Sequence, residues 1–438
     1  MQRDSNIAVL IVVNTMAILK CIACGKTYEI TDLRYRCDCG ELLEVEHDLE
    51  TLKETFTKEL LDSRLGALKL PYSSGVWRYK ELILDIDDKF ICSRPEGNTN
   101  QYKSEKIAEY TGLSDFSLKH EGENPTGSFK DRGMTGGISA AKMLGAKTVA
   151  CASTGNTSAS MAAYAAMNGM NGVVFIPEGK IAFGKLAQAI AYGSKVIQIE
   201  GDFDDAMALV QEASLELGMY LLNSVNPFRI EGQKAISIEA IQQRGWDVPD
   251  WFVLPGGNLG NSSAMGKAMM ELKELGIIDK VPRIAVIQAH GANPFYKYFN
   301  NDYQDFASVK ADTLATAIKI GNPVSYKKLE KVMKWCNGIV DEVSEQEIVD
   351  AKAIVDASGI GAEPASCATV AGAKKLCEKG IIKADDSVVG ILTGNLLKDP
   401  DVVVNYHKGA LPGLESKYAN KTIQIKPELS EVKRVLGK

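Results

Sequence analysis

The chain has 438 residues and a formal net charge of −6; 45% of its residues are apolar and 24% are charged. A chain of this length buries a sizeable core and divides into two or more domains. The mild acidic balance, with no basic cluster to oppose it, argues against a nucleic-acid-binding surface.

Residues 1–16 are predicted to be an extension outside the fold. The apolar run at residues 7–13 is far shorter than the roughly 20 residues that cross a membrane, and no cleavage pattern of a secretory signal follows it. We therefore expect no membrane partner, and Met16 is an alternative start of the chain.

Residues 17–50 resemble a small zinc ribbon. "CIACGK" holds Cys21 and Cys24 in the spacing of a metal knuckle, whereas Cys37 and Cys39 in "CDCG" are one residue closer than the usual pair. Two alternatives remain open: a structural zinc ion bound by all four thiols, or a former ribbon whose thiols stay reduced. A ribbon also raises the hypothesis of a module that binds nucleic acid or protein, which the acidic chain disfavours.

The other five cysteines are scattered between residues 92 and 377. Nine cysteines in a chain of this length do not make a disulfide framework. The pattern fits a reducing compartment, and we expect a cytoplasmic protein.

From about residue 117, apolar runs of strand length alternate with segments of helical length. Ser344 and Glu347 form a capping box before one of these helices. The alternation predicts an α/β fold with mainly parallel strands. The predicted strands are Thr148–Ala152, Gly172–Pro177, Lys195–Glu200, Met219–Leu222, Trp251–Leu254, Ile284–Gln288 and Val388–Leu392.

The stretch "GENPTGSFKDRG", residues 122–133, places Lys130 just past a turn. Three interpretations compete. A solvated lysine at a helix start is the commonest situation for this residue type. A nucleotide phosphate loop shares the glycine spacing, but Ser128 and Phe129 stand where Lys and Ser/Thr belong. The third is a Schiff-base lysine, whose amine must be partly desolvated to be nucleophilic near neutral pH.

Three loops that follow predicted strands carry groups suited to a cofactor. "STGNTSAS", residues 153–160, contains Asn156, whose amide is free to point across a crevice. "PGGNLGN", residues 255–261, exposes backbone N–H groups beside a helix start and so suits an anion, although a glycine-rich turn without a ligand is the alternative. "TGNLLKDP", residues 393–400, begins with a hydroxyl, that of Thr393. We expect all three at one sheet edge.

A lysine, an asparagine loop, a glycine cradle and a strand-end hydroxyl are the parts needed to hold pyridoxal phosphate. From roughly residue 70 to residue 400, the chain resembles the threonine synthases, which are fold type II pyridoxal phosphate enzymes. The motifs that carry the resemblance are "NPTGSFKDRG", "STGNTSAS", "LNSVNPFRIEGQK", "PGGNLGN", "GAEPASCATVAG" and "LTGNLLKD".

The resemblance implies an α/β fold of the tryptophan synthase β type, with two open domains of mainly parallel sheets behind the ribbon-like segment at residues 17–50. A large cofactor domain would combine residues 51–130 with residues 226–438. A small α/β domain would span residues 131–225.

The resemblance also implies roles for single residues. Lys130 would hold pyridoxal phosphate as a Schiff base and move protons during the reaction. Asn156 would bind the ring hydroxyl, and Thr393 the ring nitrogen. The backbones that would bind the cofactor phosphate are those of Gly256, Gly257, Asn258, Leu259 and Gly260. The substrate contacts would be Thr157, Asn223, Ser224 and Arg229. Many relatives have His at position 395, where this chain has Asn, so no role is carried over to Asn395.

The implied reaction converts O-phospho-L-homoserine and water to L-threonine and phosphate, in an expected homodimer. The alternatives are other enzymes of the same fold, such as cysteate synthase or a threonine/serine dehydratase. Dehydratases follow the asparagine loop with His and use a run of glycines for the phosphate. This chain has Thr157 and "PGGN" instead.

Charged and polar neighbours of these motifs have structural interpretations. Asp131 and Arg132 are interpreted as an ion pair at a helix start. Glu363 and Ser366 are interpreted as helix N-terminal caps. For Arg229, a pair with Glu231 is the alternative to a phosphate contact.

Overall fold

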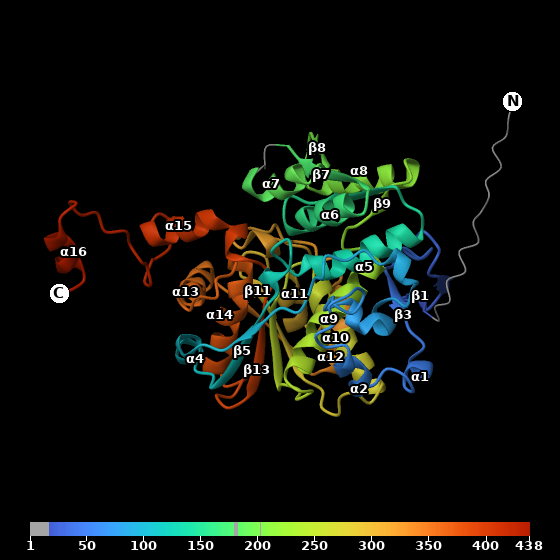
Figure 1. The fold of residues 1–438 in the computed structure, drawn as a ribbon, viewed down its shortest axis with the longest axis horizontal. Coiled ribbons are helices and arrows are strands. Elements are labelled where there is room, and N and C mark those ends of the chain that lie inside the picture. The colour runs from blue at the N-terminus through green and yellow to red at the C-terminus, as the bar shows by residue number, and fades with distance from the viewer. Residues whose placement is uncertain (1–16, 179–182, 202) are drawn as a thin grey trace.

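The computed structural model describes residues 17–178, 183–201 and 203–438 (Figure 1). The extension predicted at residues 1–16 lies outside the described residues. The fold is α/β, and each of the seven predicted strands is present with its ends shifted by no more than one residue.

A six-stranded sheet forms the centre of the molecule. Its strands, in spatial order, are β12 (Ile339–Val343), β11 (Arg283–Ala289), β10 (Trp251–Pro255), β13 (Ser387–Leu392), β5 (Asp115–His120) and β4 (Gln101–Tyr102). The first five strands are parallel, and only β4 pairs antiparallel, with β5. Because helices cover both faces, the central strands β11, β10 and β13 read as nearly continuous apolar runs.

Alternate side chains of β10 enter two different cores. Phe252 and Leu254 belong to the larger core, whereas Trp251 and Val253 belong to the smaller one. The larger core includes helices α9 (Pro227–Gln243), α10 (Gly260–Glu274) and α12 (Tyr326–Trp335). The smaller core includes α4 (Glu105–Thr111), α13 (Glu345–Ala357) and α14 (Pro364–Glu378). Figure 1 shows these two helical layers on opposite sides of the sheet.

A second, four-stranded sheet lies above the first in Figure 1. Its order is β8 (Lys195–Ile199), β7 (Asn171–Pro177), β6 (Thr148–Ala152) and β9 (Tyr220–Leu221), and all pairs are parallel. Its helices are α6 (Asn156–Met167), α7 (Phe183–Ala191) and α8 (Phe203–Glu216). All four strands come from the segment predicted as the small domain.

Helix α5 (Lys130–Met143) packs closely against α9, and glycines permit the approach. A Cβ on Gly232 of α9 would fall 1.9 Å from the carbonyl oxygen of Arg132. A Cβ on Gly136 of α5 would fall 2.7 Å from the carbonyl oxygen of Phe228. This contact brings the first turn of α5 beside the first turn of α9, where the lysine and arginine of the predicted site lie.

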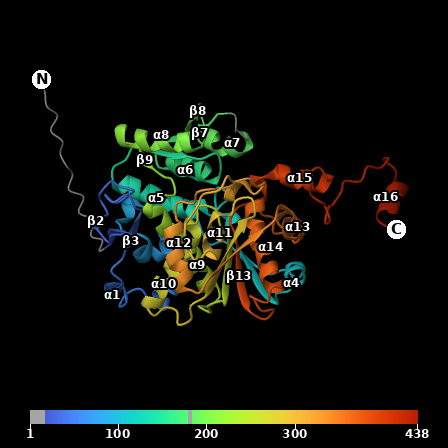
Figure 2. The same ribbon diagram turned by 180° about the vertical axis from the view of Figure 1, so that it is seen from behind.

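The cysteine-bearing segment forms a three-stranded antiparallel sheet at one end of the molecule (Figure 2). Its strands are β1 (Ile18–Cys21), β2 (Thr27–Glu29) and β3 (Leu43–Glu46), and α1 (Leu49–Leu52) and α2 (Lys58–Ser63) follow. Lys328 donates to the carbonyl oxygen of Leu43 over 2.7 Å. Buried His47 lies 2.9 Å from Glu231 of α9. These contacts join the segment to the large sheet.

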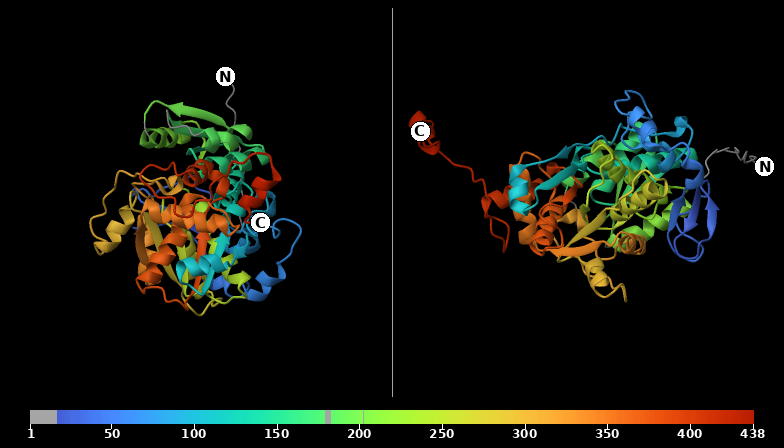
Figure 3. Two further views of the ribbon diagram at one scale, coloured as in Figure 1. Left: turned by 90° about the vertical axis from the view of Figure 1, so that its left-hand side faces the viewer. Right: turned by 90° about the horizontal axis from the view of Figure 1, so that it is seen from below.

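The chain ends in a segment that extends away from the body (Figure 3). Helix α15 (Pro400–Lys408) still packs on α13 through Tyr406. Beyond Asn420, the backbone hydrogen bonds join only neighbouring residues, up to and including α16 (Leu429–Val435). The shorter elements are η1 (Trp77–Tyr79), α3 (Lys80–Ile83), η2 (Asp88–Phe90), η3 (Glu121–Glu123), α11 (Pro294–Asn300), η4 (Thr316–Ile318) and η5 (Leu396–Lys398).

No helix in the described part of the chain combines the length and the apolar character that a bilayer crossing requires.

Candidate active site

Lys130 is the first residue of α5. Its amine lies 3.9 Å from the centre of the Phe129 ring. Burial, followed by the positive charge of Arg229, lowers the pKa of Lys130 to about 7, against a smaller raising effect of Glu363. An amine in this state is partly uncharged at neutral pH and is therefore nucleophilic. This environment suits the Schiff-base interpretation better than that of a solvated lysine.

The turn before Lys130 is held by Asp131. The carboxylate of Asp131 accepts hydrogen bonds from the backbone N–H and the hydroxyl of Thr126, both over 2.6 Å, and from the Ser160 hydroxyl over 2.5 Å. The predicted ion pair between Asp131 and Arg132 is wrong. Arg132 instead pairs with Glu121 over 2.6 Å and with Glu239 over 2.8 Å, because its side chain turns to the opposite side of α5.

Backbone hydrogen bonds join the lysine turn to the loop after β13. The N–H of Phe129 donates to the carbonyl oxygen of Thr393 over 3.0 Å, and the N–H of Asn395 donates to that of Gly127 over 2.9 Å. Gly127 has a φ of +84°, which glycine adopts without strain. Thr393 is thereby fixed beside the start of α5, as the predicted site requires.

Arg229 is buried in the first turn of α9, with 2% of its surface exposed. One terminal nitrogen donates to the carbonyl oxygen of Leu222 over 2.7 Å, while the Nε atom has no partner in the structure. No carboxylate in the described part of the chain forms an ion pair with Arg229, and burial lowers its pKa to about 10. The alternative pair with Glu231 is not formed, since Glu231 pairs with Lys234 and Lys267. A buried, unpaired guanidinium group is costly unless it meets an anion.

Asn156 and Thr393 both lie beside the carboxyl group of Glu363. The Asn156 amide donates to the two carboxyl oxygens over 3.1 and 3.3 Å. The Thr393 hydroxyl donates over 3.5 Å and also lies 3.0 Å from the Ser366 hydroxyl. Residues from three separate loops therefore meet at one point.

The predicted capping roles of Glu363 and Ser366 are wrong. Glu363 occupies the N-cap position of α14, but its side chain makes no capping hydrogen bond. The Ser366 hydroxyl accepts from the backbone N–H of Gly394 over 2.9 Å instead. Both side chains turn away from their own helix because polar groups of the Thr393 loop lie closer.

The loop after β10 presents free backbone N–H groups at the start of α10. Leu259 takes a left-handed conformation with φ of 65°, which turns the chain into the helix. In the described structure, no backbone carbonyl accepts from the N–H groups of Gly257, Asn258, Leu259 or Gly260. Contrary to the prediction for Gly256, its N–H is already used: it donates to the carbonyl oxygen of Ile287 in β11 over 2.7 Å. Gly256 thus shapes the loop without offering an N–H to a phosphate.

These residues fit pyridoxal phosphate. The N-terminus of a 15-residue helix with free N–H groups suits a phosphate. Asn261 in the same helix is 8% exposed, and neither its amide nitrogen nor its amide oxygen has a hydrogen-bond partner among the described residues. A Cβ on Gly260 of this loop would fall 3.3 Å from the side chain of Ile230 in the first turn of α9, the helix that packs against the lysine-bearing α5. Each unsatisfied group would gain a partner from a phosphorylated aldehyde of this kind.

The predicted substrate residues differ in their availability. Asn223 is buried, and its amide exchanges two hydrogen bonds of 3.0 Å with the backbone of Ala152, which ties β6 to the loop after β9. Thr157 and Ser224 are partly exposed. Asn223 therefore has a structural function whatever else it contacts.

The expectation that the three loops lie at one sheet edge is wrong, because the loops do not all leave the same sheet. The loops after β10 and β13 leave adjacent strands of the six-stranded sheet, whereas the asparagine loop leaves β6 of the other sheet. The site lies where the two sheets face each other. Alternation of strands and helices gives no information on which sheet receives each strand.

The four N-terminal cysteines converge. Cys21 lies 3.5 Å from Cys39 and Cys24 lies 3.5 Å from Cys37, and all four sulfur atoms are within 4.8 Å of one another. Hydrogen bonds from the backbone N–H of Cys39 and from the hydroxyl of Tyr28 lower the pKa of Cys37 to about 6. The short Cys37-x-Cys39 spacing does not prevent a four-thiol cluster.

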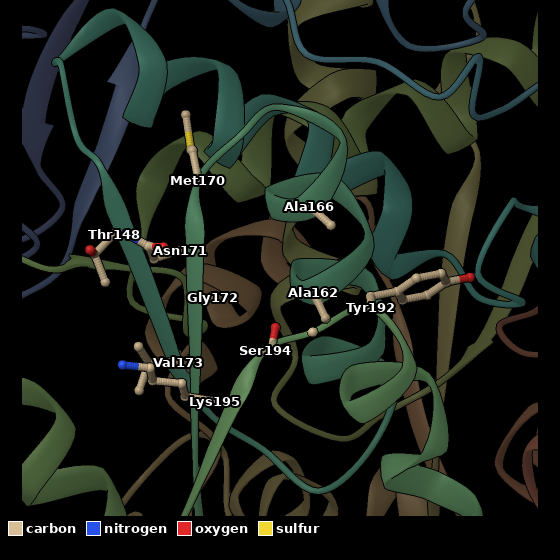
Figure 4. A pocket seen from close by; sticks show the side chains of 11 residues that line it. Thr148, Ala162, Ala166, Met170, Asn171, Gly172, Val173, Tyr192, Ser194 and Lys195 are labelled. Carbon is tan, nitrogen blue, oxygen red and sulfur yellow. The ribbon is translucent and has the colours of Figure 1, made fainter.

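A surface groove of about 270 Å³ lies on the four-stranded sheet, away from the residues of the candidate active site (Figure 4). Ala162 of α6, Gly172 of β7 and Tyr192 after α7 line it. None of the predicted site residues contributes to its lining.

Comparison with known proteins identifies a family and close relatives. Residues 92–394 match the family described as pyridoxal-phosphate dependent enzyme. The chain is 44% identical to a threonine synthase of Methanocaldococcus jannaschii, over 95% of this chain and 98% of the relative. It is 45% identical to a threonine synthase of Methanosarcina acetivorans, over 88% and 93% of the two chains. Threonine synthase 2 of Arabidopsis thaliana, a chloroplastic protein, is 40% identical over 94% of this chain and 82% of its own length.

Solved structures share the fold at lower identity. Threonine synthase from Escherichia coli aligns with a TM-score of 0.69 at 16% identity, over 94% of both chains. Maize serine racemase aligns with a TM-score of 0.60 at 22% identity, over 72% of this chain and 92% of its own.

Proposed function

The chain belongs to the threonine synthase family of pyridoxal-phosphate dependent enzymes, and we propose the residues with which it carries out that family's reaction. The reaction converts O-phospho-L-homoserine and water to L-threonine and phosphate. The observation that carries the assignment of roles is the placement, on adjacent helix starts, of a lysine whose pKa is about 7 and a buried arginine that pairs with no carboxylate among the described residues.

Lys130 would hold the cofactor covalently through its amine, and Asn156 and Thr393 would contact its ring. Gly257, Asn258, Leu259 and Gly260 would bind its phosphate through their N–H groups. Bound pyridoxal phosphate withdraws electrons from the α-carbon of an amino acid attached to it.

The chain's own residues then move protons and hold the leaving group. The uncharged amine of Lys130 accepts the proton from the α-carbon and later a proton from the β-carbon. Arg229 binds the phosphate group as it leaves the γ-carbon, since a guanidinium fork matches phosphate oxygens. Thr157, Ser224 and the second N–H of the Asn223 amide complete the contacts with that phosphate. Water adds its hydroxyl group at the β-carbon. The three protons that are freed, from the α-carbon, the β-carbon and the water, end on the α-carbon, the γ-carbon and the departing phosphate.

Phosphate release tests the assignment. The purified protein, loaded with pyridoxal phosphate, is supplied with O-phospho-L-homoserine or O-phospho-L-serine. We expect release from the first and threonine as its product. Turnover of O-phosphoserine alone would contradict the assignment and favour a relative such as cysteate synthase.

We propose a homodimer that uses the C-terminal arm, residues 421–438. Ile423, Leu429 and Leu436 of this arm are 64%, 69% and 62% exposed, and the arm lies off its own body (Figure 3). The arm carries five basic and two acidic side chains, whereas the whole chain has a charge of −6, so the arm complements the body of a second copy. Light scattering should give a dimer for the full chain and a monomer for a chain ending at Asn420. An unchanged dimer after truncation would contradict this role of the arm.

The cysteine cluster supports a structural zinc ion bound by Cys21, Cys24, Cys37 and Cys39, because tetrahedral thiolate sites of this size are typical of zinc. None of the nine cysteines forms a disulfide, which supports function in the reducing cytoplasm. We assign the six-stranded sheet to the large domain and the four-stranded sheet to the small one.

A further inference from the structure

Glu363 connects two residues that the proposed function places around the cofactor ring. Its carboxyl group accepts from the Asn156 amide over 3.1 and 3.3 Å and from the Thr393 hydroxyl over 3.5 Å. The bond to Thr393 is at the limit of a hydrogen bond, so the contact with Asn156 is the stronger one. Asn156 begins α6 and Glu363 precedes α14, so the contact also joins the two halves of the site.

The surroundings of Glu363 are built for a carboxyl group. The residue is 2% exposed, and it forms no ion pair with any cation in the described ranges. The backbone of Gly394 approaches so closely that a Cβ there would fall 2.4 Å from the carboxyl group. Burial raises the pKa of Glu363, with Asp399 acting in the same direction and Lys398 and Lys130 against it. A buried acid without a paired cation costs free energy, and it needs a function to be retained there.

The contact fixes which end of the Asn156 amide faces the ring. In its ionised form Glu363 has only acceptor atoms, so the Nδ2 atom of Asn156 points toward it, as the two hydrogen bonds show. We infer that the two carboxyl oxygens share one N–H group of Nδ2, and no described residue accepts from the other. Without Glu363, the amide is free to rotate and present its oxygen, which repels an electron-rich ring oxygen.

A short chain of hydroxyl groups anchors the other side of the carboxyl group. The N–H of Gly394 donates to Ser366 over 2.9 Å, and the hydroxyl groups of Ser366 and Thr393 lie 3.0 Å apart. Because the single hydroxyl proton of Thr393 is donated toward Glu363, the Ser366 hydroxyl is the donor between the two.

We propose that Glu363 is a positioning residue that holds the Asn156 amide with an N–H directed at the ring hydroxyl of the cofactor. The inference rests on the proposed function, since it takes Asn156 as the contact of that hydroxyl. Glu363 acts through Asn156 and is assigned no proton transfer or substrate contact of its own. Its contribution is to cofactor affinity and to the electron distribution of the ring.

The test measures cofactor binding in the absence of substrate. Glu363→Gln keeps the length of the side chain but offers an N–H as well as an oxygen, so it no longer enforces one orientation of Asn156. We expect the dissociation constant for pyridoxal phosphate to rise about ten-fold, as for one lost hydrogen bond to a charged group. The visible absorption maximum of the bound cofactor should shift as well. Glu378→Gln, at the exposed end of the same helix, serves as the matched control and should change neither.

A double-mutant cycle separates positioning from a general structural effect. If Glu363 acts through Asn156, then adding Glu363→Gln to the Asn156→Ala variant should raise its dissociation constant for pyridoxal phosphate by less than about two-fold. If the affinity losses of the two single variants multiply in the double variant, the inference is overturned. An unchanged affinity and spectrum in Glu363→Gln would overturn it as well. If Glu363→Gln does not fold, Glu363→Asp, whose carboxyl group is one methylene shorter, replaces it with the same expected loss. Failure of the wild-type protein to bind pyridoxal phosphate would overturn the proposed function as well. If the wild-type protein binds it normally, an unchanged Glu363→Gln variant overturns only the role of Glu363.

Discussion

Arg229 lowers the pKa of Lys130 across the contact between α9 and α5. Both side chains lie in the first turn of their helices, and the close approach that glycines allow brings these turns together. Burial has the larger effect on the amine, and the arginine adds to it. The reactivity of the Lys130 amine therefore depends in part on a cation of the neighbouring helix.

Replacing Lys130 with Ala is expected to lower kcat by at least ~10³-fold, because the covalent attachment of the cofactor and the proton shuttle are lost together. The visible absorbance that borohydride abolishes should also disappear. Lys142→Ala, in the last turn of the same helix, is the control and should retain both. A Lys130→Ala protein with wild-type turnover would rule out this role.

The reaction of the apoenzyme with pyridoxal phosphate should depend on pH in a defined direction. Only the uncharged amine reacts, and its pKa in the folded protein is about 7, so the association rate should rise with pH and reach half its plateau near pH 7. Arg229→Met removes a neighbouring positive charge, which raises the pKa of Lys130 and moves the midpoint to higher pH. Stopped-flow absorbance measures both curves. A wild-type midpoint near pH 10 would show a solvated lysine.

If the cysteine cluster binds zinc, metal analysis should find about one zinc ion per chain, and Cys21→Ser should lose it, since a structural site needs all four ligands. Turnover should change little in that variant, because the cluster lies in the separate N-terminal sheet. Cys377→Ser, outside the cluster, is the control. Protein purified without chelator and free of zinc would exclude the site.

The contact between α5 and α9 should tolerate no side chain at position 232. A Cβ there would fall 1.9 Å from the carbonyl oxygen of Arg132, and backbone atoms cannot move aside as side chains do. We expect Gly232→Ala to lower the free energy of unfolding by about 2–3 kcal/mol, the cost of overpacking a core. Gly155→Ala, where a Cβ meets no atom within 4 Å, is the control for stability. Equal urea midpoints for both variants would contradict the packing argument.

Of the strands that the sequence predicted, all but Lys195–Glu200 are free of charged residues. β12 was not predicted because Asp341 and Glu342 interrupt its run, although Asp341 is buried and bonded to Lys379. β5 was not predicted as a strand because it ends in Lys119 and His120. The ammonium group of Lys119 is neutralised by Glu239, 120 residues later in the chain. Partners so distant in sequence leave no local pattern.

Contacts between residues distant in sequence also limited what could be predicted of the site. Motifs identified Lys130, Asn156 and Thr393 because each follows a recognisable turn or strand end. Glu363 was interpreted as a helix cap because its position favours one, and only the fold shows that Asn156 and Thr393 lie closer to it than its own helix N–H groups. The assignment of the loops to one sheet edge was wrong for the related reason that strand order is a property of the folded chain.

Arg229→Met is the sharpest test of the phosphate contact. The substrate phosphate is a dianion that must be bound while it leaves, and Arg229 is a buried cation with a free Nε atom and no carboxylate partner in the described chain. Met preserves much of the apolar stem and removes the charge. We expect kcat/KM for O-phosphohomoserine to fall by ~10²-fold or more, about 3 kcal/mol, while the cofactor still binds. Arg244→Met, at the end of the same helix and paired with Asp247, is the control and should show wild-type kinetics. Wild-type kinetics in a folded Arg229→Met protein would exclude Arg229 as the phosphate anchor.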